Sequence, residues 1–408
     1  MSTEGESLNQ PKSHVADLRV MGSPPHVVLA YPYVRHDRDA VGVCVEQLSD
    51  YLKLQSGMAT QILSIEPTSR MWKRVRELRI FSKEKARKAH RAYSQFEFLA
   101  RVLVKLVSLR SASRLVVITV DAPTGIGLPV QLARWINPQI LHVAWVMDLY
   151  RIADTEHGTM LNKMRASVET NTLSKADRVV TLGECMRKRL TRQIDREVDV
   201  LPIWQDETWI KPSVHPVREA NDSLPINLVY SGSARIGVHP LQKVAEVVQS
   251  YEDPRRIRLI VRGKGDEVDQ LRARMSANSQ SVIFEDLVPF LDVPAVLAAA
   301  DIHLVTLAEN KTGTCVPSKT YAAMAAGRPI LYFGNPDGQA ARDILMAGCG
   351  FVVEPGSDIN EVIESATTNA GQLEDMGKRG HDFFLQNRSM AAMGRCWSDY
   401  LNRMARSD

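Results

Sequence analysis

The sequence predicts an α/β protein with two doubly wound parallel sheets, and three observations support that class. Short runs rich in Val, Ile and Leu alternate with amphipathic helical stretches along almost the whole chain. Runs that are apolar throughout are typical of parallel strands that helices cover on both faces. The chain has 408 residues, too many for one ordinary core. The alternation stops once, between Gln205 and Leu224, and then begins again. We therefore expect two Rossmann-like domains.

The expected domain limits follow from that interruption. Residues 1–24 are polar and are predicted to be a disordered leader, and residues 25–206 to form the first domain. Residues 207–225 are the expected linker, residues 226–388 the second domain, and residues 389–408 a helix that crosses back to the first. Two such sheets facing each other leave a cleft at the carboxyl ends of their strands. The expected strands are His26–Pro32, Thr60–Ile65, Arg114–Val120, Ile140–Met147, Arg178–Leu182, Val198–Ile203 and, in the second half, INLVYSG, IRLIVRG, SVIFEDL, DIHLVTL, RPILYFG and GFVVEPG.

The composition indicates a soluble globular protein, with 44% hydrophobic and 24% charged residues. No run of about 18 apolar residues is present, and the N-terminal stretch lacks the apolar core of a signal peptide. The five cysteines are scattered and form no CxxC motif, which argues against metal or disulfide roles. We expect a cytoplasmic protein.

Positive charge is concentrated in one segment, residues 70–114. It contains fourteen Lys or Arg and three Asp or Glu, a balance of 14 − 3 = +11, whereas the net charge of the chain is only +4. Trp72 and Phe81 lie among these basic residues. We expect residues 70–110 to contact an anionic membrane surface. An ordinary solvated face is the alternative, and nucleic acid is not expected because no recognition motif accompanies the charge.

The stretch from Thr314 to Leu331 contains an unusual helix start. Pro317 suits a first helical position, and Gly327 and Pro329 are typical of a helix end. Lys319 then lies in the first turn, where the helix dipole disfavours a cation. A bound phosphate would reverse that effect. The backbone N–H groups of residues 312–314 are also expected to approach a diphosphate. The alternative is an ordinary strand–helix unit in which a lysine falls in the first turn.

The second half resembles a known family. The landmarks, in order, are NLVYSGSARIG, LIVRGKGDEVDQL, VIFEDLVPFLDVPAVLAAADIHLVTL, VPSKTYAAMAAGRPIL and AGCGFVVEPGS. Together they are similar to the nucleotide-sugar-binding domain of family-4 retaining glycosyltransferases of the GT-B fold. In the first half, WVMDLY and VDVLPIWQDETWIKP resemble branches that build bacterial surface polysaccharides. The resemblance implies two Rossmann-like domains facing across a cleft, and a nucleotide-diphosphate sugar as co-substrate without any other cofactor.

The sequence departs from the family pattern at several positions. Thr314 and Ala322 stand where the family commonly has the two carboxylates of Glu-x7-Glu. Ser233 and Val238 occupy the places of an Arg and a Lys, which leaves Arg235 as a substitute. The family's His-Asp pair reads Met147-Asp148, and its Gly-Gly is reduced to Gly42.

The expected site combines these residues with elementary chemistry. The leaving diphosphate must be stabilised either by a metal on carboxylates or by cations at a helix N-terminus. Asp37-Arg38-Asp39 has the spacing of a metal-binding DxD but reads as a solvated loop, so we expect no metal. Lys319 and Arg235 are the expected diphosphate ligands, and Asp148 contacts the donor sugar or takes the acceptor proton. The expected donor-binding residues are Gly232, Ser233, Gly263, Lys264, Gly265, Glu309, Gly313, Thr314, Val316, Pro317 and Ser318.

The resulting hypothesis is a retaining, metal-independent glycosyltransferase at the inner face of the membrane. Its acceptor would be a lipid-linked saccharide or a polysaccharide. Because the paired glutamates are absent, a non-catalytic nucleotide-binding or scaffold partner remains open. A nucleotide-sugar epimerase of the same architecture is a third possibility.

Overall fold

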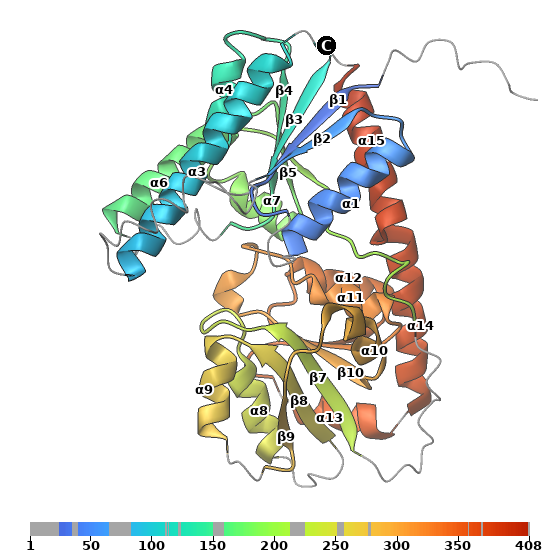
Figure 1. The fold of residues 1–408 in the computed structure, drawn as a ribbon. Helices are drawn as coiled ribbons and strands as arrows, with labels where there is room; N and C mark the ends of the chain where they lie inside the picture. The colour runs from blue at the N-terminus through green and yellow to red at the C-terminus, as the bar shows by residue number, and fades with distance from the viewer. Residues whose placement is uncertain are drawn as a thin grey trace, which may run out of the picture.

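The computed structural model describes most of the chain and shows two α/β domains, one above the other in Figure 1. The described residues are 24–34, 40–64, 83–110, 112, 114–120, 124–149, 159–212, 225–250, 257–275, 279–357, 359–368 and 370–406. Several expectations concern residues outside these ranges: most of the leader, the Asp37–Asp39 motif, Trp72 and Phe81 in the basic segment, and most of the linker.

The first domain contains a parallel sheet of six strands in the order β2-β1-β3-β4-β5-β6. All six residues of the central strand β3 are buried, as expected for an apolar run with helices on both faces. The strands are β1 His26–Ala30, β2 Thr60–Leu63, β3 Leu115–Val120, β4 Leu141–Val146, β5 Arg178–Thr181 and β6 Val198–Val200. The helices are α1 Ala40–Leu54, α3 Lys83–Ser108, α4 Leu128–Ala133, α6 Met160–Ser174 and α7 Glu184–Leu190.

The second domain repeats this design with the parallel order β12-β11-β10-β7-β8-β9. The strand order of this sheet reverses between β10 and β7. Doubly wound sheets bind ligands at such a topological switch point. The strands are β7 Ile226–Ser233, β8 Ile257–Lys264, β9 Val282–Glu285, β10 Ile302–Thr306, β11 Ile330–Phe333 and β12 Gly350–Val353. The helices are α8 Leu241–Ser250, α9 Asp266–Arg274, η1 Phe290–Asp292, α10 Val293–Ala298, η2 Glu309–Lys311, α11 Lys319–Ala325, α12 Gln339–Ala347, α13 Ile359–Thr368 and α14 Ala370–Asn387.

The chain passes between the domains twice, at neighbouring points. Gln205 donates its N–H to the carbonyl of Arg388 (3.0 Å), and Met390 donates to the carbonyl of Gln205 (2.9 Å). Helix α15, Met390–Met404, then packs on the first domain: the ring of Trp397 lies 4.9 Å from that of Trp145 in β4. Figure 1 shows α14 and α15 running along one side of both domains.

Helix α11 begins two residues later than Pro317, the first position that its sequence suggests. Ser318 is the N-cap residue and Lys319 the first residue of the helix. Pro317 still takes part in the first turn, because its carbonyl accepts the N–H of Thr320 (3.2 Å). Differences of this size are usual at helix ends, and Lys319 remains in the first turn.

Candidate functional site

Three glycines allow the backbone to pack closely at the carboxyl ends of β7 and β8. Gly232 has φ +118°, and a Cβ there would lie 2.8 Å from Cε of Lys319. Gly265 has φ +117°, and its Cβ would lie 2.1 Å from the carbonyl oxygen of Ala234. A Cβ on Gly263 would lie 2.6 Å from the carbonyl oxygen of Gly232. These contacts leave no room for a side chain at any of the three positions. Because glycine has no Cβ, Lys319 can approach the strand end at Gly232.

The ammonium group of Lys319 lies in the space that Gly232 leaves. Its Nζ donates to the hydroxyl of Tyr230 (2.5 Å) and to the carbonyl of Ser233 (2.9 Å). It also lies 4.1 Å from the centre of the Tyr230 ring, within cation–π distance. Loss of water contact lowers the pKa of Lys319 to about 7. Among the residues that the structure describes, no salt bridge to Lys319 is found, so its oxygen partners carry no formal charge.

A second cation, Arg235, lies on the same side of the strand ends. The backbone N–H of Arg235 donates to Nδ1 of His239 (3.1 Å). Burial, followed by the charges of Lys319 and Arg235, lowers the pKa of His239 to about 3. The imidazole is therefore neutral at neutral pH. Lys264, at the end of β8, is in register with Ser233 and adds a third positive charge to this edge. We call Lys319, Arg235 and Lys264 the basic edge.

The loop after β10 contacts the first domain. Gly313 has φ +76°, and a Cβ there would lie 2.7 Å from the carbonyl oxygen of Cys185. Thr314 is fully buried, and its carbonyl accepts the N–H of Leu149 (2.7 Å). That contact brings the exposed Asp148, which directly precedes Leu149, to the boundary between the domains.

Two of the backbone donors expected to face a diphosphate are used within this loop. The N–H of Thr312 donates to Glu309 (3.0 Å) and that of Thr314 to Lys311 (2.9 Å). Glu309 itself is exposed at the start of η2, and Val316 is buried. The expected site residues thus form two groups: one at the ends of β7 and β8 with Lys319, and one at the domain boundary.

A pocket of about 720 Å³ lies between the domains and includes Ser318. One wall is α1, whose carboxylates Glu46 and Asp50 are spaced i, i+4 and so share a face. The same pocket is lined by Trp209 and Phe290, whose rings stack at 4.3 Å and 10°. This pocket is not among the sites predicted from the sequence. The carboxylate spacing on α1 and a tryptophan in the irregular segment were the available signals.

Gln47 fixes the inner wall of the same pocket. Its side-chain oxygen accepts the N–H of the Trp204 indole (2.9 Å), and its amide donates to Asp206 (3.4 Å). Within the described part of the chain, no salt bridge involves Glu46, Asp50 or Asp206. The pocket therefore combines three carboxylates with an aromatic wall. Its charged side chains are acidic, whereas those of the basic edge are positive.

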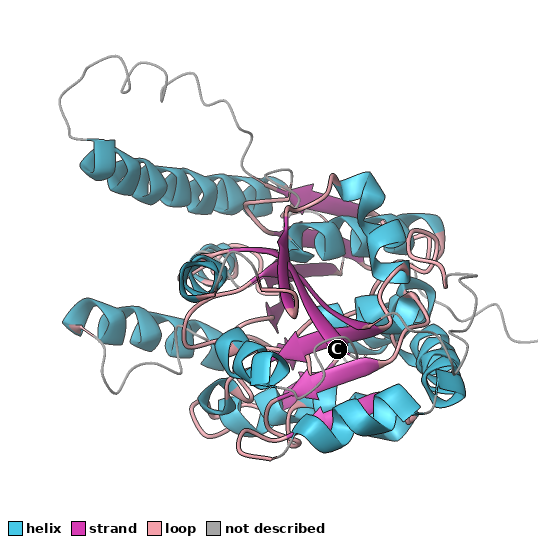
Figure 2. Ribbon diagram, turned by 90° about the horizontal axis from the view of Figure 1, so that it is seen from below, coloured by secondary structure: helices cyan, strands magenta, loops and turns pink. Residues whose placement is uncertain are grey.

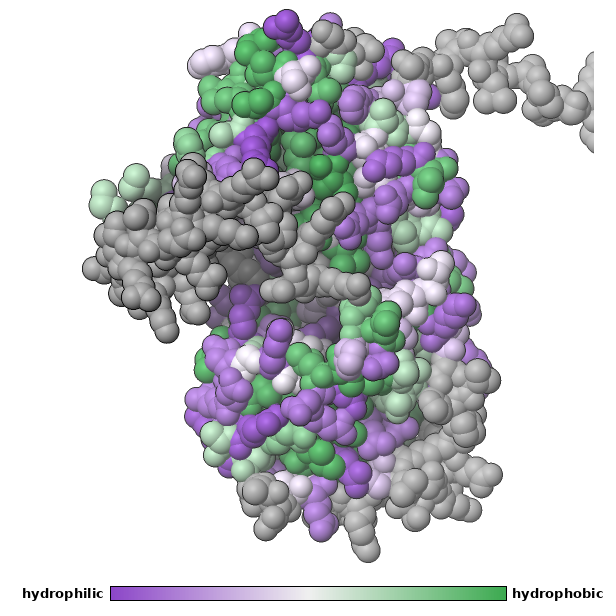
Figure 3. Space-filling model, in the orientation of Figure 1, coloured by the Kyte–Doolittle hydropathy of each residue, from purple (hydrophilic) through white to green (hydrophobic). Residues whose placement is uncertain are grey.

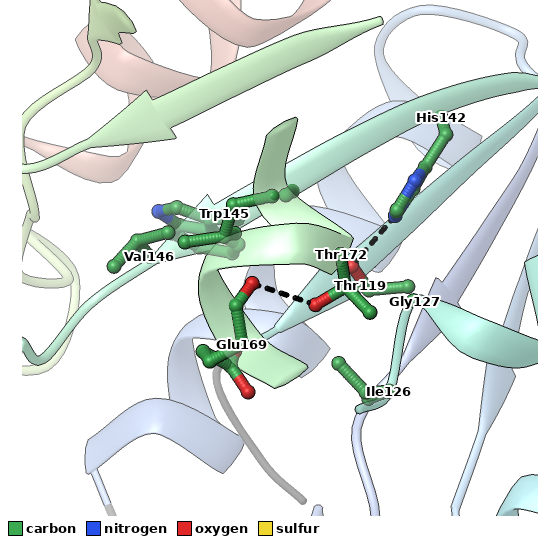
Figure 4. A pocket seen from close by; sticks show the side chains of 10 residues that line it. Thr119, Ile126, Gly127, His142, Trp145, Val146, Glu169 and Thr172 are labelled. Atoms are coloured by element: carbon green, nitrogen blue, oxygen red, sulfur yellow. Dashed lines mark hydrogen bonds between the residues drawn. The ribbon is translucent and has the colours of Figure 1, made fainter. Parts of the chain in front are cut away.

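A much smaller cavity, of about 10 Å³, lies inside the first domain (Figure 4). His142 points toward Thr119, and their Nε2 and Oγ1 atoms are 2.9 Å apart. The Thr172 hydroxyl donates to the backbone carbonyl of Glu169 (2.8 Å). This volume accommodates about one water molecule and no sugar or nucleotide. It is a feature of the core.

The described residues contain no group of three or more His, Cys, Asp or Glu arranged to hold a metal ion. In the same part of the chain, no helix has the length and apolar content needed to span a membrane.

Comparison with known proteins agrees with this architecture. Residues 227–369, from β7 to the end of α13, match the family profile described as Glycosyl transferases group 1. The probable glycosyltransferase WbjE of Pseudomonas aeruginosa is 25% identical over 197 residues, which are 46% of this chain and 48% of WbjE. The chain thus aligns with about half the length of that curated relative.

Solved structures show the same fold over almost the whole chain. Sucrose-phosphate synthase of Thermosynechococcus elongatus has a TM-score of 0.67 at 13% identity, covering 94% of this chain and 100% of that one. HepE of Anabaena, solved in complex with UDP, has a TM-score of 0.64 at 12% identity, covering 93% and 100%. HepE has also been solved with UDP-glucose. Together with the two parallel sheets, these similarities establish the GT-B fold.

Proposed function

We propose that this protein is a glycosyltransferase that takes a sugar from a nucleotide-diphosphate sugar. The observation that carries the proposal is the Lys319 ammonium, placed by Gly232 at the ends of β7 and β8 in the domain that matches a glycosyltransferase family. Its partners among the described residues are neutral oxygens, so a bound diphosphate would give Lys319 an anionic partner. The complexes of HepE with UDP and UDP-glucose support a donor of this class.

The donor diphosphate would lie along the basic edge. Lys319 and Arg235 would stabilise the charge that develops on the leaving diphosphate, and Ser318 would donate a hydrogen bond to a phosphate oxygen. Gly263 and Gly265 would form the turn beside the base. We propose a route without a metal ion, because these cations supply the positive charge that a metal would otherwise supply.

The acceptor would enter the interdomain pocket. Carboxylates such as Glu46 and Asp50 accept hydrogen bonds from sugar hydroxyls and repel a second phosphate group. The stacked pair Trp209 and Phe290 offers an apolar wall for the face of a sugar ring. Ser318 lies at this pocket and next to Lys319, so acceptor and donor would meet there. In a retaining front-face reaction, the leaving phosphate takes the acceptor proton while Asp148 orients a sugar.

We further propose that the acceptor is a lipid-linked saccharide or polysaccharide at the inner face of a membrane. The basic segment, residues 70–110, would bring the protein to anionic headgroups there.

A non-catalytic partner of the same fold is the second candidate, and one observation favours it. By the resemblance, Thr314 stands where the family commonly has a carboxylate. It is fully buried at the domain boundary, and its neutral hydroxyl cannot act as that carboxylate would. A donor-binding protein without transfer would be consistent with this substitution. A nucleotide-sugar epimerase would also bind the donor without transfer.

Product analysis separates these functions. UDP-, GDP- and ADP-sugars are incubated with the protein, with and without a detergent extract of bacterial membrane lipids as acceptor. We expect nucleoside diphosphate release that depends on the extract and that falls about 10²–10³-fold in Lys319→Gln. Lys243→Gln, an exposed lysine on α8, is the matched control. An altered sugar without extract would indicate an epimerase, and donor binding without either product would indicate a scaffold.

A further inference from the structure

Helix α6 presents several apolar side chains to solvent and buries two polar ones. Its buried residues include Glu169 and Thr172. Its exposed residues include Met160, Met164 and Val168, spaced four apart, of which Met160 is 80% and Met164 59% exposed. An ordinary surface helix of a globular protein turns its large apolar side chains toward the core.

Helix α4 and the turn that follows it share this property. Leu128, Leu132, Trp135 and Ile136 are exposed and are spaced i, i+4, i+7 and i+8, so they lie along one face. Trp135 is 84% exposed. A tryptophan presented in this way is unusual in a surface that faces only water, and common at a membrane–water interface.

The two apolar faces are continuous. A Cβ on Gly125 would lie 3.1 Å from Cδ1 of Leu128 and 3.4 Å from Cγ1 of Val168, so these two side chains meet above Gly125. Figure 3 shows hydrophobic surface at the upper left over α4 and paler hydrophobic surface at the left edge over the tip of α6. We call this surface the α4–α6 stripe, comprising Leu128, Leu132, Trp135, Ile136, Met160, Leu161, Met164 and Val168.

The exposed charges that α6 places beside the stripe are positive. On α6 the exposed charged residues are Lys163 and Arg165, and its one acidic residue, Glu169, is buried. Helix α3 packs against α4. Figure 2 shows α3 and α6 projecting from the same side of the molecule. An apolar stripe beside basic residues matches the chemistry of an anionic lipid surface.

We propose that the α4–α6 stripe inserts into the headgroup region of an anionic membrane. Lys163 and Arg165 contact lipid phosphates while Trp135, Met160 and Met164 enter the acyl boundary. A second copy of this chain fits less well, because a two-fold contact would place the like charges of α6 opposite each other. The inference rests on the proposed function at a membrane surface, but its test measures lipid binding alone. Its failure would therefore leave the proposed donor chemistry intact.

Co-sedimentation of the full chain with vesicles tests the inference. The vesicles contain phosphatidylcholine alone or phosphatidylcholine with phosphatidylglycerol. We expect binding to the anionic vesicles and a loss of roughly tenfold or more in Trp135→Ser/Met164→Ser. The matched control is Leu345→Ser/Met346→Ser, an exposed apolar pair on α12 that should bind as the wild type does.

A second pair of variants separates insertion from attraction by charge. Lys163→Gln/Arg165→Gln should lose the preference for phosphatidylglycerol, and quenching of Trp fluorescence by brominated acyl chains should vanish in Trp135→Phe. Circular dichroism checks that each variant is folded. Equal vesicle binding by the stripe variant and the α12 control would overturn the proposal. A wild-type dimer in analytical ultracentrifugation that the stripe variant abolishes would also overturn it and assign the stripe to a second copy.

Discussion

At the scale of single residues, one glycine and one lysine define the site. Gly232 adopts a conformation with positive φ, and its missing side chain is the space that Cε of Lys319 enters. The ammonium group is then held by Tyr230 and Ser233. The sequence indicated that Lys319 was unusual because its charge is misplaced at a helix start. It did not reveal Tyr230 or Gly232 as partners, because the contact joins elements that are distant in the chain.

Comparison of two glycines tests this arrangement. Gly232→Ala and Gly237→Ala both place a Cβ on a residue with positive φ, but nothing lies within 4 Å of a Cβ at Gly237. We expect both variants to lose about 1 kcal/mol of unfolding free energy from backbone strain. Gly232→Ala should in addition displace Lys319 and weaken nucleoside diphosphate binding at least about tenfold. Equal nucleotide affinity of the two variants, measured by calorimetry, would contradict the account.

At the scale of elements, a buried ion pair joins three helices beside the point where the chain crosses between domains. Both oxygens of Asp343 in α12 accept from Arg388 (3.0 Å), which follows α14. The hydroxyl of Tyr321 in α11 donates to the same carboxylate (2.7 Å). Gln339 also donates to Asp343 (2.9 Å), and its oxygen accepts the N–H of Glu184 in the first domain. This network holds α11, and therefore Lys319, in a fixed position.

Removal of one partner should be costly, since it leaves a buried charge unpaired. We expect Arg388→Met to lower the free energy of unfolding of the second domain by about 3–5 kcal/mol in urea denaturation. Asp343→Asn/Arg388→Met should recover part of that loss. An effect below about 1 kcal/mol for Arg388→Met would show that the pair is not buried in solution.

At the scale of the whole molecule, the sequence predicts the strands well and the surfaces between elements poorly. Buried strands such as β3 and β10 read directly as apolar runs, and both sheets follow from them. The interdomain pocket cannot be read from the sequence in this way. Its walls come from α1, from the segment around Trp209 and from Phe290, which meet only when the domains pack. The exposed apolar side chains of α6, such as Met160 and Met164, are likewise not evident from the sequence.

Three histidines distributed over both domains predict how the stability of the whole molecule depends on pH. Burial is the largest cause in each case, and it lowers the pKa of His142 and His303 to about 4 and of His239 to about 3. Unfolded histidine has a pKa near 6.5, so below about pH 6.5 the unfolded chain binds more protons. Stability should therefore fall as the pH drops from about 6.5 to about 4.

Scanning calorimetry measures this effect. Each histidine contributes up to about 1.4 kcal/mol for each pH unit in that window. His142→Gln should reduce the slope for the first domain and leave that of the second unchanged. A midpoint of unfolding that is constant from about pH 6.5 to about pH 4.5 would contradict the burial of these imidazoles.

The central claim, a diphosphate site built on Lys319, is tested most directly by nucleotide binding to the wild type, Lys319→Gln and Lys243→Gln. Calorimetric titration with UDP, GDP, ADP and their monophosphates is the measurement. We expect one diphosphate to bind more tightly than its monophosphate, with a loss of about tenfold or more in Lys319→Gln only. Because the pKa of free Lys319 is about 7 and a diphosphate favours the charged form, affinity should also fall as the pH rises above about 7. Wild-type affinity in Lys319→Gln, or no binding of any nucleotide to the wild type, would contradict the claim.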